Sequence, residues 1–182
     1  MSQKTSQRSQ RVYFRKEAFK FSAAHMTVFP DGSKESLHGH NYTTEISFDL
    51  RENSQGSSQS SLVPFSFFKD AIREICKNWD EKFLLPKTCP FLKILSQTQQ
   101  EIEFHLCQKR YVFPTEDVLI LEIANISAEA LAQEFSRQLL TRLDPIVVER
   151  EILGMTVRID ESPGQGASTH WQPNTPIKSS QE

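Results

Sequence analysis

Three of the five histidines in this 182-residue chain lie within sixteen residues: His25, His38 and His40. Residues two apart on a β-strand point to the same face, so His38 and His40 share a face if their segment is a strand. Tyr42 and Ile46 continue the same parity, which marks this face as apolar and buried. The sequence therefore predicts that two imidazoles point inward from one strand.

His25 follows a second segment with strand periodicity, residues 12–24, in which Phe19 and Phe21 share its parity. We therefore expect all three imidazoles to meet on the buried side of neighbouring strands. Burial of polar rings without partners is costly, and a Zn²⁺ ion would remove that cost. Three protein ligands leave a fourth position for water or substrate, which is typical of catalytic zinc. The spacing alone does not identify the metal, because iron or cobalt would accept the same ligands. It also allows a site without metal, in which His25 is a hydrogen-bonded core residue and His38 and His40 lie in a loop.

The remaining hydrophobic pattern predicts a single α+β domain. Apolar residues alternate in one further strand and follow helical spacing in two helices, the second of them capped by Asn125 or Ser127. Between the helices, shorter alternating runs predict a hairpin inserted within residues 87–118. The expected elements are strands at 12–24, 40–50 and 152–161, helices at 66–79 and from 125 or 127 to 143, and hairpin strands near 102–106 and 111–113.

Composition fits an ordinary globular protein, with 37% hydrophobic and 24% charged residues. The net charge of −2 gives no general attraction to nucleic acid or to anionic membranes. No apolar run is long enough to span a bilayer. We expect one domain at 11–172 between disordered polar tails at 1–10 and 173–182, with an exposed polar loop at 51–61.

The three cysteines are odd in number and widely spaced: Cys76, Cys89 and Cys107. This arrangement argues against a disulfide framework and against a thiolate-rich metal site. It predicts a protein of the reducing cytoplasm.

Several short motifs resemble those of one enzyme family. The segments FSAAH (21–25) and LHGHNY (37–42) are similar to those of the 6-pyruvoyl tetrahydropterin synthase family, which includes the 6-carboxytetrahydropterin synthases. The similarity covers nearly the whole expected domain, in family order. It continues in LVPFS (62–66) with Lys69, WDEKFLLP (79–86), NISAEALA (125–132) and VRIDESP (157–163).

The resemblance implies the tunnelling fold, a four-stranded antiparallel sheet with two helices on one face. It implies a homo-oligomer, a trimer or a dimer of trimers, with active sites at subunit interfaces. It also implies zinc on the three histidines and a pterin substrate anchored by Glu161, with Ser127 and Glu129 as further substrate-binding residues. A carboxylate suits the anchoring role because it accepts two parallel N–H bonds from the amino-pyrimidine edge of a pterin.

The resemblance breaks at the position of the nucleophile. Pyruvoyl- and carboxy-type members have a catalytic cysteine shortly before the HGH motif, but the interval between His25 and His38 contains none. Glu35 stands three residues before His38, which resembles a Glu-type subgroup that cleaves the side chain of 7,8-dihydroneopterin triphosphate. The product, 6-hydroxymethyl-7,8-dihydropterin, is a folate precursor. A carboxylate near zinc can move protons during carbon–carbon cleavage.

A second departure concerns the proton relay. The family pairs an aspartate with a histidine, and here Asp80 is followed by Glu81. Either Glu81 takes the place of the histidine or another group donates the proton. His170 is one candidate for the proton donor. The alternative interpretation is that His170 is a solvent-exposed histidine of the C-terminal tail. A triphosphate would also need cations, and four are available: Lys69, Lys82, Arg110 and Arg158.

Three functions remain open from the sequence. The Glu-type zinc lyase is favoured by Glu35. A 6-carboxytetrahydropterin synthase on the path to queuosine would need a thiol from one of the three cysteines. A non-catalytic pterin- or metal-binding relative is favoured by Glu81, which stands where the relay histidine is expected.

Overall fold

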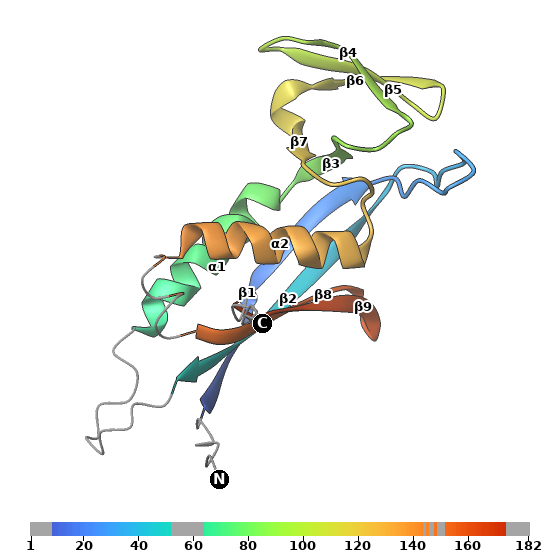
Figure 1. Cartoon of the computed structure of the whole chain (residues 1–182). Coiled ribbons are helices and arrows are strands. Elements are labelled where there is room, and N and C mark those ends of the chain that lie inside the picture. Colours follow the sequence, from blue (N-terminus) through green and yellow to red (C-terminus); the bar gives the residue numbers. More distant parts are fainter. Residues whose placement is uncertain (1–8, 52–63, 144, 146–147, 149–151, 174–182) are drawn as a thin grey trace, which may run out of the picture.

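The computed structural model describes residues 9–51, 64–143, 145, 148 and 152–173. The polar loop expected at 51–61 and most of both expected tails lie outside these residues, although Ser9 and Gln10 already belong to the first strand. Within these ranges no helix is long and apolar enough to cross a membrane. The strands and helices, labelled in Figure 1, are β1 (Ser9–His25), β2 (His38–Arg51), α1 (Phe65–Trp79), β3 (Lys82–Pro86), β4 (Leu92–Gln97), β5 (Glu101–Leu106), β6 (Lys109–Pro114), β7 (Val118–Leu121), α2 (Ala128–Arg142), β8 (Ile152–Ser162) and β9 (Gln165–Trp171).

Six strands form the main sheet, in the order β7-β3-β1-β2-β8-β9. The pairs β1–β2, β2–β8 and β8–β9 are antiparallel, whereas β3 runs parallel to both β1 and β7. Both α-helices lie on one face of this sheet (Figure 1). The predicted α+β class and the helix placement are confirmed. The expected count of four strands was wrong: β1, β2, β8 and β9 form an antiparallel set, and β3 and β7 extend the sheet at one edge.

The main core lies between the helices and the inner face of the sheet. Each helix buries one stripe of side chains at helical spacing. Burial of a large apolar side chain contributes about 1.5–3 kcal/mol relative to exposure. The predicted stripes are confirmed, and their buried members are Phe68, Ile72, Ile75, Cys76 and Trp79 in α1, and Leu131, Phe135, Leu139 and Leu143 along α2 and its C-cap.

The insertion folds as a separate three-stranded antiparallel sheet, β4-β5-β6. The predicted hairpin consists of β5 and β6. Its turn residues Cys107 and Gln108 both have positive φ, 49° and 65°, as a type I′ hairpin turn requires. Strand β4 was not predicted, because its residues after Leu92 are all exposed and leave no periodic pattern.

Strand β3 connects the insertion to the body of the domain. Its Leu84 faces the main core, whereas Phe83 and Leu85 face a second core shared with the insertion. In that second core the ring of Phe104 is nearly parallel to those of Phe83 and Phe113, each with its centroid 6.0 Å away. Alternate residues of one strand therefore serve two cores.

The last strand, β9, was not located in the sequence. Its segment QGASTHW lacks apolar alternation because the strand lies at the sheet edge and is largely exposed. Gly166 permits its close approach to β8, since a Cβ atom there would lie 2.3 Å from the carbonyl oxygen of Ile159.

We predict that Phe104→Ala lowers the free energy of unfolding by about 3–5 kcal/mol, the usual cost of removing a large aromatic ring from a core. Val112→Ala, on the other face of the inserted sheet where the side chain is 41% exposed, should change it by less than about 0.5 kcal/mol. Urea unfolding followed by circular dichroism measures both variants. Equally small losses would show that the second core does not stabilise the protein.

Candidate active site

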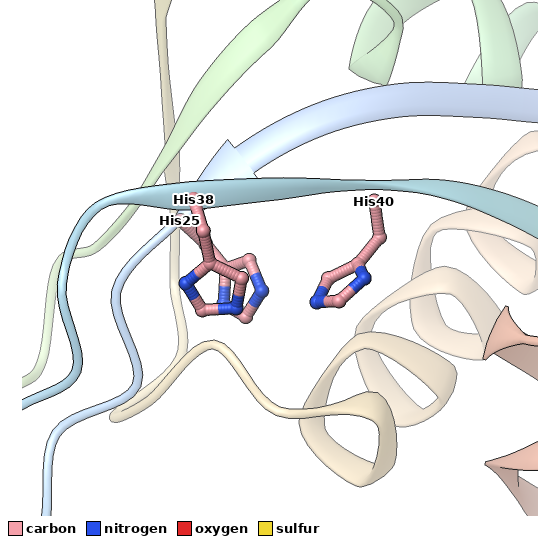
Figure 2. Close-up of side chains that lie close together, drawn as sticks. All are labelled: His25, His38 and His40. Atoms are coloured by element: carbon pink, nitrogen blue, oxygen red, sulfur yellow. The ribbon is translucent and has the colours of Figure 1, made fainter.

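Figure 2 shows the three histidine side chains gathered at the adjoining ends of β1 and β2. His25 pairs directly with His38, and His40 pairs with Ala23 in the same ladder. The ring centroids are 4.5 Å apart for His25–His38, 4.9 Å for His38–His40 and 5.3 Å for His25–His40. One nitrogen atom of each ring lies within 4.8 Å of the other two. The predicted convergence is confirmed, although only His25 is fully buried.

The ring orientations leave lone pairs for an ion. His25 Nδ1 lies 3.2 Å from the Ile126 carbonyl oxygen, and His38 Nδ1 lies 2.8 Å from that of Ser36. A carbonyl oxygen only accepts, so each Nδ1 carries the hydrogen and each Nε2 keeps a free lone pair, as metal-binding histidines require. Nε2 of His25 is buried and has no hydrogen-bond partner among the residues that the structure describes. The three side chains could therefore hold one transition-metal ion.

The charge state of His25 fits the same role. Burial, followed by repulsion from His38 and His40, lowers the pKa of His25 to about 4. The ring is therefore neutral at pH 7. Only a neutral imidazole can donate a lone pair to a metal.

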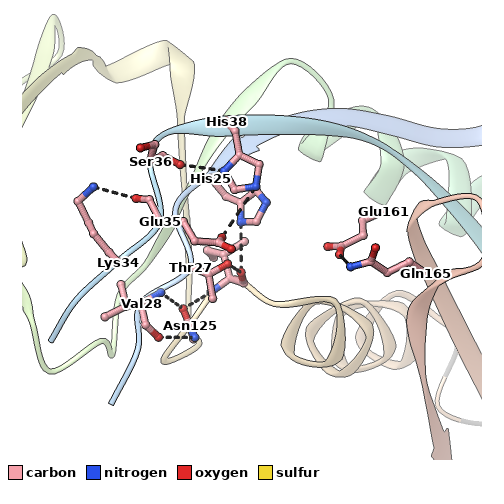
Figure 3. Close-up of polar contacts among 11 residues, drawn as sticks. His25, Thr27, Val28, Lys34, Glu35, Ser36, His38, Asn125, Glu161 and Gln165 are labelled. Atoms are coloured by element: carbon pink, nitrogen blue, oxygen red, sulfur yellow. Dashed lines mark hydrogen bonds and ion pairs between the residues drawn. The ribbon is translucent and has the colours of Figure 1, made fainter. Parts of the chain in front are cut away.

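Glu35 lies beside the histidines, on the loop between β1 and β2. Its Oε2 is 3.9 Å from His38 Nε2, and its backbone N–H donates to the Thr27 carbonyl oxygen at 3.0 Å. A hydrogen bond from the Thr27 side chain, helped by the nearby His38, lowers the pKa of Glu35. The group is therefore a carboxylate at neutral pH. The structure thus brings Glu35 to the histidine cluster, as Figure 3 shows.

The insertion supports the loop that carries Glu35. The Lys34 ammonium donates to the Glu35 carbonyl oxygen at 3.0 Å and lies 5.5 Å from the centre of the Tyr111 ring on β6. Gly32, with φ of 81°, packs against Phe91 so closely that a Cβ atom would lie 2.9 Å from that ring. The inserted sheet therefore helps to position the carboxylate.

The segment before α2 holds the same loop from the other side. The Asn125 side chain accepts from the Val28 N–H and donates to the Val28 carbonyl oxygen, both at 2.9 Å (Figure 3). Asn125 was expected only as a possible helix cap, and its bridging role was missed because it depends on a partner distant in the sequence. The cap is Ser127, whose hydroxyl accepts from the Ala130 N–H at 3.4 Å. Glu129 is exposed in the first helical turn, where its own N–H and the Ser127 hydroxyl lower its pKa.

Glu161 lies on β8, on the inner side of the sheet and apart from the histidines (Figure 3). Its carboxylate accepts a hydrogen bond of 2.7 Å from Gln165 Nε2. Between this residue and the histidines lies Tyr42, whose side chain is completely buried. Burial raises the pKa of the Tyr42 phenol, and the negative charges of Glu161 and Glu35 raise it further. Both carboxylates therefore lie near one hydroxyl group.

Asp80 and Glu81 form hydrogen bonds with the main chain of β1 rather than with the histidine rings. Asp80 accepts from the Ser22 N–H at 2.7 Å, and the Glu81 N–H donates to the Ser22 carbonyl oxygen at 2.7 Å. Glu81 has an unusual φ of 56° and lines a pocket of about 560 Å³ together with Ser22, Asn41 and His40. Ser22 and Asn41 alternate with the inward residues of β1 and β2, so this pocket opens on the outer face of the sheet.

The cations and the extra histidine suggested by the sequence also lie away from the histidine cluster. His170 is exposed on β9, with Nδ1 2.9 Å from the Thr156 hydroxyl. Lys82 lines the outer pocket, and each of the four cations already contacts a group of this chain. These contacts are Arg158 with Asp160, Arg110 with Glu103, Lys82 with the Glu116 carbonyl oxygen, and Lys69 with the Phe65 ring.

No cysteine in the described part of the chain contributes a ligand atom to the histidine cluster. Cys76 lies in the main core, and burial raises the pKa of its thiol to about 11. Cys89 is buried in the second core and Cys107 is half-buried beside it. All three are free thiols.

Comparison with known proteins identifies the class to which this fold and site belong. The sequence model of the 6-pyruvoyl tetrahydropterin synthase family matches residues 14–171. A protein of Methanocaldococcus jannaschii, provisionally named a 6-carboxy-5,6,7,8-tetrahydropterin synthase, is 30% identical over 148 residues, which are 81% of this chain and 87% of that protein. The chain therefore belongs to the 6-pyruvoyl tetrahydropterin synthase family, whose members act on pterins.

Solved structures agree with this assignment. The 6-pyruvoyl tetrahydropterin synthase of Plasmodium vivax has a TM-score of 0.79 and 30% identity, covering 91% of this chain and 99% of that one. The Plasmodium falciparum enzyme gives the same TM-score and coverage at 28% identity. The Caenorhabditis elegans enzyme, with a TM-score of 0.53 and 14% identity, shares the fold.

We predict that iodoacetamide at pH 8 alkylates Cys107 first and leaves Cys76 intact in the folded protein. The thiolate is the reactive form, and a pKa of about 11 leaves only about one Cys76 thiol in a thousand ionised at that pH. Peptide mass spectrometry measures the modification, with urea-unfolded protein as the control in which all three react. Rapid labelling of native Cys76 would contradict its placement in the core.

Proposed function

We propose that this protein is a zinc-dependent lyase that cleaves the side chain of 7,8-dihydroneopterin triphosphate to give 6-hydroxymethyl-7,8-dihydropterin for folate synthesis. The observation that carries the proposal is the Glu35 carboxylate 3.9 Å from His38 Nε2, where other family members are expected to place a thiol. A carboxylate there favours proton transfer over thiol chemistry.

The Plasmodium relatives support this role for Glu35. Two further structures of the P. vivax enzyme, each 29% identical to this chain with a TM-score of 0.79, are variants in which a catalytic glutamate is replaced by alanine or by cysteine. A catalytic glutamate is thus already described for a relative with this fold.

The residues of this chain can divide the work of the reaction. A zinc ion held by His25, His38 and His40 would act as a Lewis acid on the side-chain hydroxyls. Glu35 would accept the proton of the second side-chain hydroxyl as the bond between the first and second side-chain carbons breaks. The electron pair moves into the dihydropterin ring system, and a proton added at the first carbon gives the hydroxymethyl group. The remaining carbons leave as an aldehyde that bears the triphosphate.

Glu161 would anchor the amino-pyrimidine edge of the pterin at the other end of the site, with Ser127 and Glu129 as further substrate contacts. Asp80 and Glu81 are held by the main chain of β1 at a pocket on the outer face of the sheet, which supports a role at the site of a neighbouring subunit in a trimer or a dimer of trimers. The three free thiols support a cytoplasmic location.

A 6-carboxytetrahydropterin synthase is the second candidate, because the M. jannaschii relative provisionally has that name. This reaction would require one of the three thiols. Full activity in a variant with all three cysteines changed to alanine would exclude it. A non-catalytic pterin-binding protein would bind the ligand without turning it over.

We predict that purified wild-type protein converts dihydroneopterin triphosphate to hydroxymethyldihydropterin, and that Glu35→Gln lowers kcat by about 100-fold or more, as expected for loss of a general base. The matched control is Glu17→Gln, at a carboxylate that is 95% exposed, which should keep full activity. Product identification by mass spectrometry decides the question. A wild-type enzyme that yields 6-carboxytetrahydropterin, or no product, would refute the proposed reaction.

We also predict that His38→Ala lowers zinc affinity by more than about 100-fold, because even the loss of a group that supports a ligand costs about 10- to 100-fold. His105→Ala, on the inserted sheet, is the control and should retain one zinc per chain. Competition with a chromophoric chelator measures affinity, and elemental analysis measures content. Unchanged zinc content in His38→Ala would remove the metal from the proposed mechanism.

A further inference from the structure

The Tyr42 hydroxyl is buried without a hydrogen-bond partner. Within the described ranges, three buried side-chain nitrogen or oxygen atoms lack one: His25 Nε2, Tyr42 Oη and Arg142 Nε. Leaving a buried polar atom without a hydrogen-bond partner costs about 1–3 kcal/mol. A buried atom that lacks a partner in the protein therefore points to a bound ligand, ion or water molecule. A metal ion would supply that partner for His25. None of the described residues supplies one for Tyr42.

The position of Tyr42 points to a ligand of the same site. Its ring centroid lies 5.7 Å from that of His40 and 6.2 Å from that of His25. The next residue, Thr43, pairs with Asp160 on β8, so Tyr42 and Glu161 occupy neighbouring positions on adjacent strands. Both point to the inner face. The Tyr42 side chain therefore lies beside both the proposed metal end and the proposed pterin-anchoring end of the site.

The Tyr42 ring is held firmly enough to direct the hydroxyl. It stacks on Phe21, with centroids 4.8 Å apart and planes inclined by 18°, and Phe21 in turn packs edge-on against Trp79 at 5.2 Å. A phenylalanine would fill this aromatic stack equally well. Packing alone does not explain a hydroxyl here.

We propose that Tyr42 is a substrate-binding residue whose hydroxyl donates a hydrogen bond to the pterin held between the three histidines and Glu161. This inference rests on the proposed function for the identity of the ligand. In a pterin held between the histidines and Glu161, the Tyr42 hydroxyl would face the middle of the ring system. The acceptor there would be N5 of the dihydropterin, which has a lone pair and lies next to the carbon that bears the side chain.

The test is Tyr42→Phe, with Tyr13→Phe, at a tyrosine that is 73% exposed, as the matched control. Neopterin is the probe because its binding can be measured by calorimetry without turnover. We expect Tyr42→Phe to keep its zinc content and to melt at the same or a higher temperature, since it removes an unpaired group. It should bind neopterin about 10-fold more weakly, the usual consequence of losing one good hydrogen bond. Tyr13→Phe should bind like wild type.

The outcomes separate this inference from the proposed function. Equal neopterin affinity in wild type and Tyr42→Phe overturns the role of Tyr42 alone, whereas a wild-type protein that binds no pterin overturns both. A crystal structure of wild type with neopterin gives a second measurement that does not depend on the variant folding. A ligand nitrogen or oxygen within hydrogen-bond distance of Tyr42 Oη is expected. A water or a protein group there instead overturns the inference.

Discussion

The pairing of His25 with His38, at the point where β1 ends and β2 begins, is the constraint on which the site depends. Antiparallel pairing places directly opposed side chains on one face, about 4.5–5.5 Å apart at Cβ, and His40 follows on that face two residues later. The pairing of two adjacent strands is therefore sufficient to bring the three imidazoles together. The core residues on the same face, including Phe21 and Ile46, hold this register, since a slip by one residue would turn every side chain to the wrong side.

Much of this arrangement could be predicted because it depends on local periodicity. The parity of the three histidines, the stripes of both helices and the β5–β6 hairpin all follow from side-chain spacing. Strands β4 and β9 could not be located in this way, because each lies at a sheet edge with most of its side chains exposed. The two extra strands of the main sheet, β3 and β7, are short segments whose pairing depends on tertiary contacts.

The candidate site shows the same difference between what local sequence predicts and what depends on tertiary contacts. Glu35 was predicted from its position before the HGH motif, but the contacts that hold its loop were not visible in the sequence, because Lys34 contacts Tyr111 on β6 and Val28 bonds to Asn125 before α2. The sequence predicted Asp80 and Glu81 as catalytic residues, yet their hydrogen bonds with the main chain of β1 hold them beside a pocket on the outer face of the sheet. Motifs can point to such residues, but their position relative to the histidines depends on the topology of the sheet.

Strand β3 has a consequence for how this protein can change over evolution. Leu84 packs in the main core, whereas Phe83 and Leu85 pack in the second core against the inserted sheet. Excising residues 87–118 would therefore strip the cover from one side of a strand that the body must keep, leaving an apolar ribbon prone to self-association. The insertion is consequently hard to lose once acquired, and its removal would have to be accompanied by polar replacements at Phe83 and Leu85.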